Sequence, residues 1–400
     1  MLSSNNCYDG PSQTMANSFS TALLALALFT ATFAVNLQTP LYAAYAAESD
    51  VGATAVTVAF AAYAAGLMPT LLLLGGLSDR IGRRLPITIA LLLGAIATAL
   101  LVWMPNWGSL VVARILLGIG TGLVTTAGTA YMTEIMGEDN ARRAALIVTS
   151  ATTLGFGGGA LATSISLGLQ GPTLMPASFI LLFLLAPLLA ILALKLPTVD
   201  VPKRVSLVRL PVFPRGTWVF GIAMILAWST SGMVIAVVPL ELKNQGLDGW
   251  TGLVIFLAIF VGFLCQPFAR RMSNTKSLVI GFVLTPLGFL VVVAGAWIGS
   301  IGVILLGTCI TSASNYGFTY LAALLEVTSR APDNRARATA GLFVYAYIGF
   351  SLPVIASGAL ADLFGLLPAM TIFATVQISI TALILTLWIK QPSLQSVKLA

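Results

Sequence analysis

The sequence predicts an all-α membrane protein with 12 transmembrane helices. Only 8% of its 400 residues are charged, 58% are hydrophobic, and the mean hydropathy is +0.98. Soluble domains contain about 25% charged residues. The apolar residues form unbroken runs of roughly 20 residues or more, which is the length that a helix needs to cross a bilayer. Membrane β-barrels show short alternating segments instead, so a barrel is excluded.

Twelve such runs follow one another along the chain. They cover residues 19–46, 52–77, 85–105, 109–134, 143–169, 174–195, 217–243, 249–268, 277–298, 301–326, 338–362 and 366–389. Polar tails, 1–18 and 390–400, flank them, and a basic, proline-containing linker, 196–216, divides them. We therefore expect two six-helix bundles, 19–195 and 217–389.

The basic residues predict that both termini are cytoplasmic. All but two of the 20 Lys and Arg residues fall in the tails, the linker and the loops on one side of this topology, the exceptions being Arg114 and Lys243. Cytoplasmic loops are enriched in Lys and Arg, so this asymmetry predicts the orientation. The net charge of +7 is then explained by topology, and no nucleic-acid partner is expected.

The two halves also resemble each other in register with the topology. Pro40 near the outer end of the first run corresponds to Pro239 in the seventh, and Glu134 in the fourth corresponds to Glu326 in the tenth. Chance matches do occur among Gly- and Leu-rich helices, but Pro and Glu matches in register favour a true repeat. The bundles are therefore predicted to be pseudo-symmetric parallel repeats.

A charged segment between the second and third runs contains the most specific motif of the chain. It reads Gly75-Gly-Leu-Ser-Asp79-Arg80-Ile-Gly82-Arg83-Arg84. Its Arg residues alone would be explained as an orientation signal. Gly82 allows a tight reversal of the chain. Asp79 follows the C-terminal end of a helix, where the helix dipole disfavours an acid, so it needs an Arg partner or the N-terminus of another helix.

This segment resembles the signature loop of the major facilitator superfamily, and the resemblance covers essentially residues 20–390. It implies a secondary transporter with two bundles that pivot around a central site. In that family the Asp acts as a latch at the cytoplasmic side. The resemblance therefore implies that Asp79 faces the start of the helix near Ala338, with Arg80 and Arg83 in the supporting charge network.

Arg114 is the one charge well inside a predicted span. Intramembrane charges usually mark a functional site, although an Arg near a helix end also snorkels to the interface, and both interpretations remain open. The run from Arg114 through Gly118 to Gly122 resembles the helix 4 motif of the superfamily, whose Arg is implicated in proton coupling.

Small residues four apart let membrane helices approach closely, so Gly118, Gly122, Gly155 and Gly159 are candidate helix-packing positions. The fifth run also resembles the efflux-associated motif of the drug:proton antiporter branch. Gly159 stands where that motif has Pro, and the repeat-related eleventh run carries Pro353 instead.

Polar side chains within the runs outline a possible substrate cavity, because buried amides and hydroxyls need partners or water. The candidates are Asn36, Gln38, Tyr63, Thr126, Thr129, Ser231, Asn315, Tyr316 and Tyr345. No Asp or Glu lies in the middle of a run. A site without carboxylates does not favour cationic substrates, and neutral, amphipathic or anionic ones are more compatible.

Together with these patterns, the family resemblance implies a monomeric secondary transporter in the cytoplasmic (inner) membrane of a bacterium. The leading hypothesis is proton-driven export of a small organic molecule, with the proton gradient as energy source. The alternative is an uncoupled or differently coupled metabolite carrier. The chain has no His and few acids, which disfavours a membrane-embedded enzyme, a metal site and any cofactor. Its soluble segments are too short for the output domain of a sensor.

Overall fold

The computed structural model describes residues 11–198 and 206–389, and within them the chain forms helices and no strand. The first half contains α1 (Pro11–Asn36), η1 (Thr39–Leu41), α2 (Tyr42–Glu48), α3 (Ala53–Leu73), α4 (Leu77–Ile81), α5 (Arg84–Trp103), α6 (Trp107–Met136), η2 (Glu138–Asn140), α7 (Ala141–Gln170) and α8 (Ala177–Ala193). The second half contains α9 (Trp218–Gly232), η3 (Met233–Val237), α10 (Val238–Asn244), η4 (Asp248–Trp250), α11 (Thr251–Ala269), α12 (Asn274–Trp297), α13 (Ile301–Ser312), η5 (Ala313–Thr319), α14 (Tyr320–Ser329), η6 (Pro332–Asn334), α15 (Arg335–Phe364) and α16 (Leu366–Ile389).

Long apolar helices account for most of the described residues. Eleven of these helical segments are long and apolar enough to cross a membrane, and α8 is a further apolar helix of 17 residues. Several elements join into one segment, as α9, η3 and α10 do in the 27-residue segment Trp218–Asn244. The predicted all-helical membrane architecture is confirmed, while the count of 12 spans remains a prediction.

Parts of the predicted tails and linker lie outside the described residues, namely 1–10, 199–205 and 390–400. Within the described part, α1 begins at Pro11, inside the predicted tail 1–18. Proline fits the first turn of a helix, because the N–H that it lacks has no helical partner there. The helix thus begins in polar sequence that a search for apolar runs leaves out.

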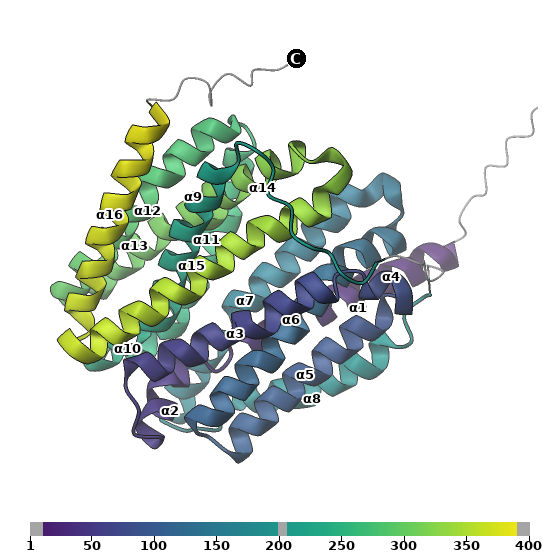
Figure 1. Ribbon diagram of the computed structural model, residues 1–400. Coiled ribbons are helices and arrows are strands. Elements are labelled where there is room, and N and C mark those ends of the chain that lie inside the picture. The colour runs from purple at the N-terminus through teal and green to yellow at the C-terminus, as the bar shows by residue number, and fades with distance from the viewer. Residues whose placement is uncertain (1–10, 199–205, 390–400) are drawn as a thin grey trace, which may run out of the picture.

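The helices before and after the linker form two groups that meet through two helix pairs (Figure 1). α3 packs against α15, and α7 packs against α11. The first pair is antiparallel, because Ala53 at the start of α3 contacts Asp362 at the end of α15. In Figure 1, α3 and α15 lie side by side across the middle of the molecule. The candidate site lies between these two groups.

Glycines allow the closest helix contacts within the first group. A Cβ added at Gly118 or Gly122 of α6 would collide with Tyr63 or Thr70 of α3. A Cβ at Gly155 or Gly159 of α7 would likewise collide with Thr32 or Phe33 of α1. These positions therefore require the absence of a side chain, as expected where membrane helices approach closely.

Two prolines interrupt the first and seventh membrane segments. Pro40 has no N–H to donate to the carbonyl of Asn36, and α1 ends at that residue. Nearby carbonyls are bonded by side chains instead, with Gln38 Nε2 donating to Val35 O (2.9 Å) and Thr163 Oγ1 to Leu37 O (2.7 Å). Pro239 follows the π-helical turn η3, where the seventh segment continues as a helix with altered hydrogen bonding instead of ending.

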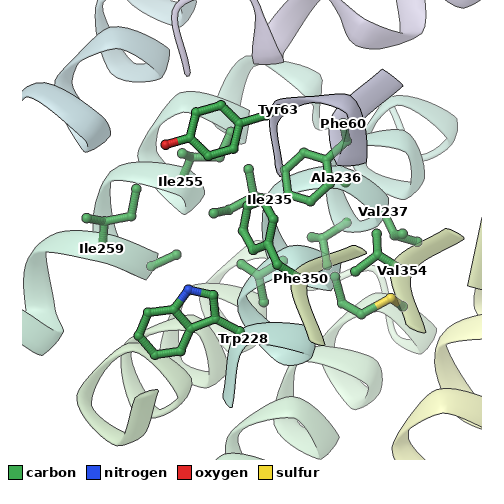
Figure 2. Packing of buried hydrophobic residues seen from close by; sticks show 14 of the residues in the cluster. Phe60, Tyr63, Trp228, Ile235, Ala236, Val237, Ile255, Ile259, Phe350 and Val354 are labelled. Carbon is green, nitrogen blue, oxygen red and sulfur yellow. The ribbon is translucent and has the colours of Figure 1, made fainter. Parts of the chain in front are cut away.

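A buried apolar cluster joins the two groups (Figure 2). Phe60 from α3 packs against Phe350 from α15 in a tilted arrangement with ring centroids 4.4 Å apart, and Val354 and Ile235 lie nearby. Tyr63 and Trp228 lie at the edge of the same cluster. The cluster closes the interface on one side of the cavity described below.

Candidate functional site

A cavity of about 320 Å³ lies between the two groups of helices. From the first half it is lined by Thr32, Val35, Asn36, Tyr63, Leu67, Leu71, Arg114, Thr121, Val124, Thr125, Thr129, Val148, Thr149, Thr152, Thr153 and Phe156. From the second half it is lined by Trp228, Ile235, Ile259, Phe263, Gln266, Tyr316, Tyr320, Phe343, Tyr347 and Phe350. We call it the central cavity.

The cavity is directed toward one end of the molecule. We call the end that carries Arg83 and Arg209 the basic end, and the end that carries Thr54 and Asp362 the opposite end. Along α6 the lining runs from Arg114 to Thr129, which is exposed and near the basic end. Gln266 lines the cavity near the end of α11 on the same side. The central cavity therefore extends from mid-depth toward the basic end.

The opposite end is closed by contacts between the two groups. Asp362 Oδ1 accepts a hydrogen bond from the N–H of Ala53 (2.6 Å), and Oδ2 accepts from the N–H of Thr54 (3.0 Å) and from its hydroxyl (2.5 Å). In the second helix pair, the N–H of Gly252 donates to Ser164 Oγ (2.9 Å). Both inter-group helix pairs are thus bonded at this end.

The signature loop forms an ion-pair network at the basic end. The carboxylate of Asp79 pairs with Arg83 (2.5 Å) and with Arg209 of the linker (2.7 Å). Arg83 also pairs with Glu134 at the end of α6 (2.8 Å). Burial lowers the pKa of Arg83, but the Glu134 and Asp79 carboxylates raise it and the net shift is upward. Arg83 therefore stays charged and joins α4 to α6.

The described part of the linker lies between the two groups at this end. Arg209 N–H donates to Leu72 O at the end of α3 (2.7 Å), and Gly76 N–H donates to Leu207 O (3.1 Å). Further along, Val212 N–H donates to Arg337 O at the start of α15 (3.0 Å). Figure 1 shows this thin segment passing from the second half to α4. We call residues 206–213 the strap.

The strap changes the expected surroundings of the signature loop. The family resemblance implies that Asp79 faces the start of the helix near Ala338 in the outward-open state, whereas in this conformation its partners are Arg83 and Arg209. A Cβ at Gly75 or Gly76 would collide with strap residues, so these glycines leave room for the strap. Gly82 has a φ of +86°, the left-handed conformation expected for the tight reversal. Arg84 donates to Leu194 O (3.1 Å), at the end of α8.

Arg114 lies in the wall of the central cavity and is 1% exposed. Its Nη1 donates to Val35 O (2.7 Å) and its Nη2 to Phe60 O (3.3 Å). The guanidinium carbon lies 4.7 Å from the ring centroid of Tyr63 and 5.3 Å from that of Phe60. Its Nε has no hydrogen-bond partner among the residues that the structure describes. The side chain thus points inward to other helices and does not snorkel to an interface.

The polar residues predicted for the substrate cavity divide into two sets. Asn36, Tyr63, Thr129 and Tyr316 are in the lining, and Gln38, Thr126, Ser231, Asn315 and Tyr345 are not. The second set bonds within the protein. For example, Asn315 Nδ2 donates to Ser231 Oγ (3.0 Å), and its Oδ1 accepts from Thr285 Oγ1 (3.0 Å). Tyr345 instead packs edge-on against Phe213 of the strap, 5.4 Å between ring centroids.

The sequence reasoning missed the aromatic part of the lining. Trp228, Tyr320, Phe343 and Phe350, which the sequence reasoning did not single out, line the cavity from the second half beside Tyr347. Phe343, Tyr347 and Phe350 recur at helical spacing on α15, which is a signal that the sequence contains. Such a stripe is also typical of lipid-facing or packing positions, and a neighbouring helix is needed to tell the two apart. Pro353 lies one turn further along α15, where its carbonyl accepts from Ser357 Oγ (2.8 Å).

A second cavity, of about 640 Å³, lies near the opposite end between η1, α2, α7 and η4. Its charged lining residues are Glu48, Lys243 and Asp248, all of them exposed, and Lys243 pairs with Asp248 at 3.7 Å. The larger volume is therefore an exposed recess with solvated charges. The central cavity, with its buried Arg114, is the better candidate site.

Comparisons with known proteins agree with this architecture. A sequence profile described as Major Facilitator Superfamily matches residues 24–352. No curated protein matches the chain by sequence. A crystal structure of a mutant of the nucleoside transporter NupG has a TM-score of 0.77 at 15% identity, covering 92% of this chain and 99% of that one.

Two structures of a bacterial homologue of the human lysosomal transporter Spinster are also similar. The inward-facing, unoccupied structure has a TM-score of 0.69 at 14% identity and covers 93% of this chain and 95% of that one. The inward-facing, occupied structure has a TM-score of 0.72 at 13% identity, with 92% and 96% covered.

At such identities the structural likeness establishes the fold alone, while the profile covers most of the chain. The signature loop, the central cavity between two helical groups and the profile match agree, and they indicate a transporter of small molecules and not an enzyme. The chain belongs to the major facilitator superfamily.

Proposed function

We propose that this chain is an alternating-access carrier that binds a small organic molecule in the central cavity. One observation carries the proposal: the cavity lies between two helical groups that are bonded together at the opposite end and separated by the cavity toward the basic end. Rocking the groups about this site would close one end as the other opens.

The orientation follows from charge. Cytoplasmic loops of membrane proteins are rich in Lys and Arg, so we place the basic end, the tails and the strap in the cytoplasm. The described conformation is then open to the cytoplasm. On this assignment the chain is a multi-pass protein of the cytoplasmic membrane, acting as a monomer.

Asp79 is proposed as the latch of the alternate conformation. In the cytoplasm-open form it is held by Arg83 and Arg209. Closing the basic end would bring α3 and the start of α15 together, and the N-terminus of a helix stabilises a carboxylate. Asp79 would then exchange Arg209 for the first turn of α15, and the strap would move out of the way.

Two modes of energy coupling are supported by different observations. The run around Arg114 resembles the helix 4 motif of the superfamily, whose Arg is implicated in proton coupling, and this resemblance supports proton-driven export. The lining supports an uncoupled or differently coupled carrier, because none of its described residues is Asp or Glu. Carboxylates are the usual proton carriers within membrane transporters.

Transport in proteoliposomes tests both the carrier function and the mode of energy coupling. The purified protein would be reconstituted, and counterflow of a panel of labelled small aromatic solutes measured with and without an imposed pH gradient. Gradient-dependent accumulation supports proton-driven export, and downhill flux that is insensitive to pH supports the carrier.

A reversible disulfide provides the matched control. Thr54→Cys with Asp362→Cys, in a variant without the native Cys residues, would join α3 to α15 at the opposite end. We expect oxidation to stop flux and a reductant to restore it. Flux that continues in the fully cross-linked protein would contradict alternating access, and an absence of flux for every solute would contradict the carrier itself.

A further inference from the structure

Arg114 gives the wall of the central cavity a positive charge that no acidic residue neutralises. No Asp or Glu is among the described lining residues, and the ion pairs of the described chain do not include Arg114. The acids nearest the cavity along its helices, Glu134 and Glu326, pair with Arg83 and Arg330. The charge is therefore uncompensated by any described carboxylate.

The protein holds this guanidinium in place through weaker interactions. Val35 O belongs to the last turn of α1 and also accepts a hydrogen bond from Gln38 Nε2, and the C-terminal end of a helix dipole favours a cation. The rings of Tyr63 and Phe60 lie within cation–π distance. An arginine has five N–H donors, and the two bonds to Val35 and Phe60 leave donors for a ligand.

Burying the Arg114 guanidinium without a counterion costs free energy, and binding of an anion beside it reduces that cost. A buried charge is normally paired or coordinated, because desolvation penalises it. A carboxylate matches the planar fork of a guanidinium and forms short, charge-assisted hydrogen bonds with it. A cationic ligand would instead add a second positive charge to the same low-dielectric space. The site thus favours anions over cations by electrostatics alone.

The remainder of the wall suits a flat ring. Tyr63 and Tyr347 lie 6.3 Å apart between ring centroids, and Trp228 and Tyr316 lie 5.2 Å apart. All four line the cavity. Figure 2 shows Tyr63 and Trp228 at the edge of the buried apolar cluster. Aromatic surfaces pack well against planar rings. The volume of about 320 Å³ is near the lower limit for ligand pockets, which suits one small ring system.

We propose that the substrate of the central cavity is a small aromatic carboxylate, with its carboxylate on Arg114 and its ring among Tyr63, Trp228, Tyr316 and Tyr347. This inference rests on the proposed carrier function and specifies the substrate class of the same site. It also gives Arg114 a role in substrate binding, separate from proton coupling.

Matched probes test the charge preference. Benzoate, benzamide and benzylamine have the same ring and differ in the charge of one substituent, and 1-naphthoate with 1-naphthamide repeats the test with a larger ring. Binding to the purified full chain would be measured by the shift in melting temperature and by titration calorimetry. We expect the acids to bind about tenfold or more tightly than their amides, since charge-assisted bonds are roughly twice as strong as neutral ones, and benzylamine not to bind.

Variants connect that preference to one side chain. Arg114→Gln should abolish the preference for acids over amides, and Arg114→Lys should keep part of it, because the charge remains while the planar fork is lost. Lys243→Gln removes an exposed cation of the recess near the opposite end and should change nothing. Melting of each variant without ligand shows whether it folds. If Arg114→Gln fails to fold, the relative affinities of the unmodified chain for acids and amides still test whether the site prefers a carboxylate.

The outcomes separate this inference from the carrier proposal. Equal binding of acid and amide, binding of the amine, or no binding of any acid would overturn the aromatic carboxylate assignment. An unchanged acid preference in a folded Arg114→Gln protein would overturn it as well. If neutral or cationic solutes are nevertheless transported in proteoliposomes, the carrier remains and only the substrate class is wrong.

Discussion

Asp362, the last acidic residue of α15, caps the first turn of α3 at Thr54. One carboxylate oxygen accepts from both the N–H and the hydroxyl of Thr54, and the other accepts from the N–H of Ala53. The first N–H groups of a helix have no partner within the helix, and its dipole favours an anion there. Because α3 and α15 belong to different groups, this cap is a bond between the two helical groups.

Removing the cap should favour opening of the opposite end. Loss of an N-cap costs about 0.5–2 kcal/mol, so Asp362→Ala should increase the open population by roughly 2- to 30-fold. Asp362→Asn keeps a capping oxygen without the charge. Its open population should therefore lie between those of the unmodified protein and Asp362→Ala. Spin labels at positions 48 and 363, both exposed, would report the opening as a longer distance.

The matched control for this prediction is Asp248→Ala. Asp248 is an exposed acid near the same end, and within the described part of the chain its one ion pair is with exposed Lys243. Its loss should leave the distance distribution unchanged. An unchanged distribution in Asp362→Ala would show that the cap does not bias the conformational equilibrium.

At the basic end, Asp79 should protect the strap from proteolysis by holding Arg209. Arg209 is fixed by the Asp79 carboxylate and by the backbone bond to Leu72. Asp79→Asn removes the charge that holds two Arg side chains. Exposed ion pairs contribute about 0.2–1 kcal/mol to stability. The partly buried Asp79–Arg209 pair should therefore slow proteolysis of the strap several-fold. Trypsin cleavage after Arg209 should accelerate by that factor.

Asp139→Asn is the control for strap release, since Asp139 is an exposed acid of η2 near the same end. Cleavage after Arg209 should keep its original rate in that variant. If Asp79→Asn is cut no faster than the unmodified chain, the ion pair has no role in retaining the strap.

The packing glycines give a third prediction, with a control on the same helix. Gly159→Ala places a Cβ against the carbonyl of Phe33, and such overpacking typically costs 1–3 kcal/mol. Gly168→Ala, further along α7, meets nothing within 4 Å. It should be neutral or slightly stabilising, because Ala is the better helix former by about 0.5–1 kcal/mol. Melting in detergent should separate the two variants, and equal melting would contradict the close α1–α7 contact.

Features encoded locally could be predicted from the sequence. Apolar length defines the membrane helices, the loop charges suggest their orientation, and Arg114 stands out because a charge within an apolar run is rare. The packing role of Gly118 and Gly159 also follows from spacing alone.

Which side of each helix faces the cavity could not be predicted. Membrane helices are apolar on all sides, so hydrophobic periodicity does not mark an inner face. Asn315 was a natural candidate as a buried amide, but Ser231 and Thr285 satisfy it within the second half. The pairing of Asp79 with Arg209 joins residues far apart in the sequence through an irregular segment that has no periodic signal.

Tyr345 and Tyr347 provide the sharpest test of the cavity boundary, since they are two residues apart on α15. Tyr347 lines the central cavity, while Tyr345 packs against Phe213 of the strap. Tyr347→Leu removes a ring from the wall of the central cavity. An aromatic pair contributes about 0.5–1.5 kcal/mol beyond its buried area, so KM for a transported aromatic solute should rise by about 2- to 10-fold.

Tyr345→Leu should affect stability and not substrate binding. It should lower the melting temperature, because the ring contact with Phe213 and the packing on Gly221 are lost, and it should leave KM unchanged. Kinetics and melting measured on both variants therefore separate binding from packing. A rise in KM for Tyr345→Leu, with none for Tyr347→Leu, would place the substrate outside the central cavity, on the strap side of α15.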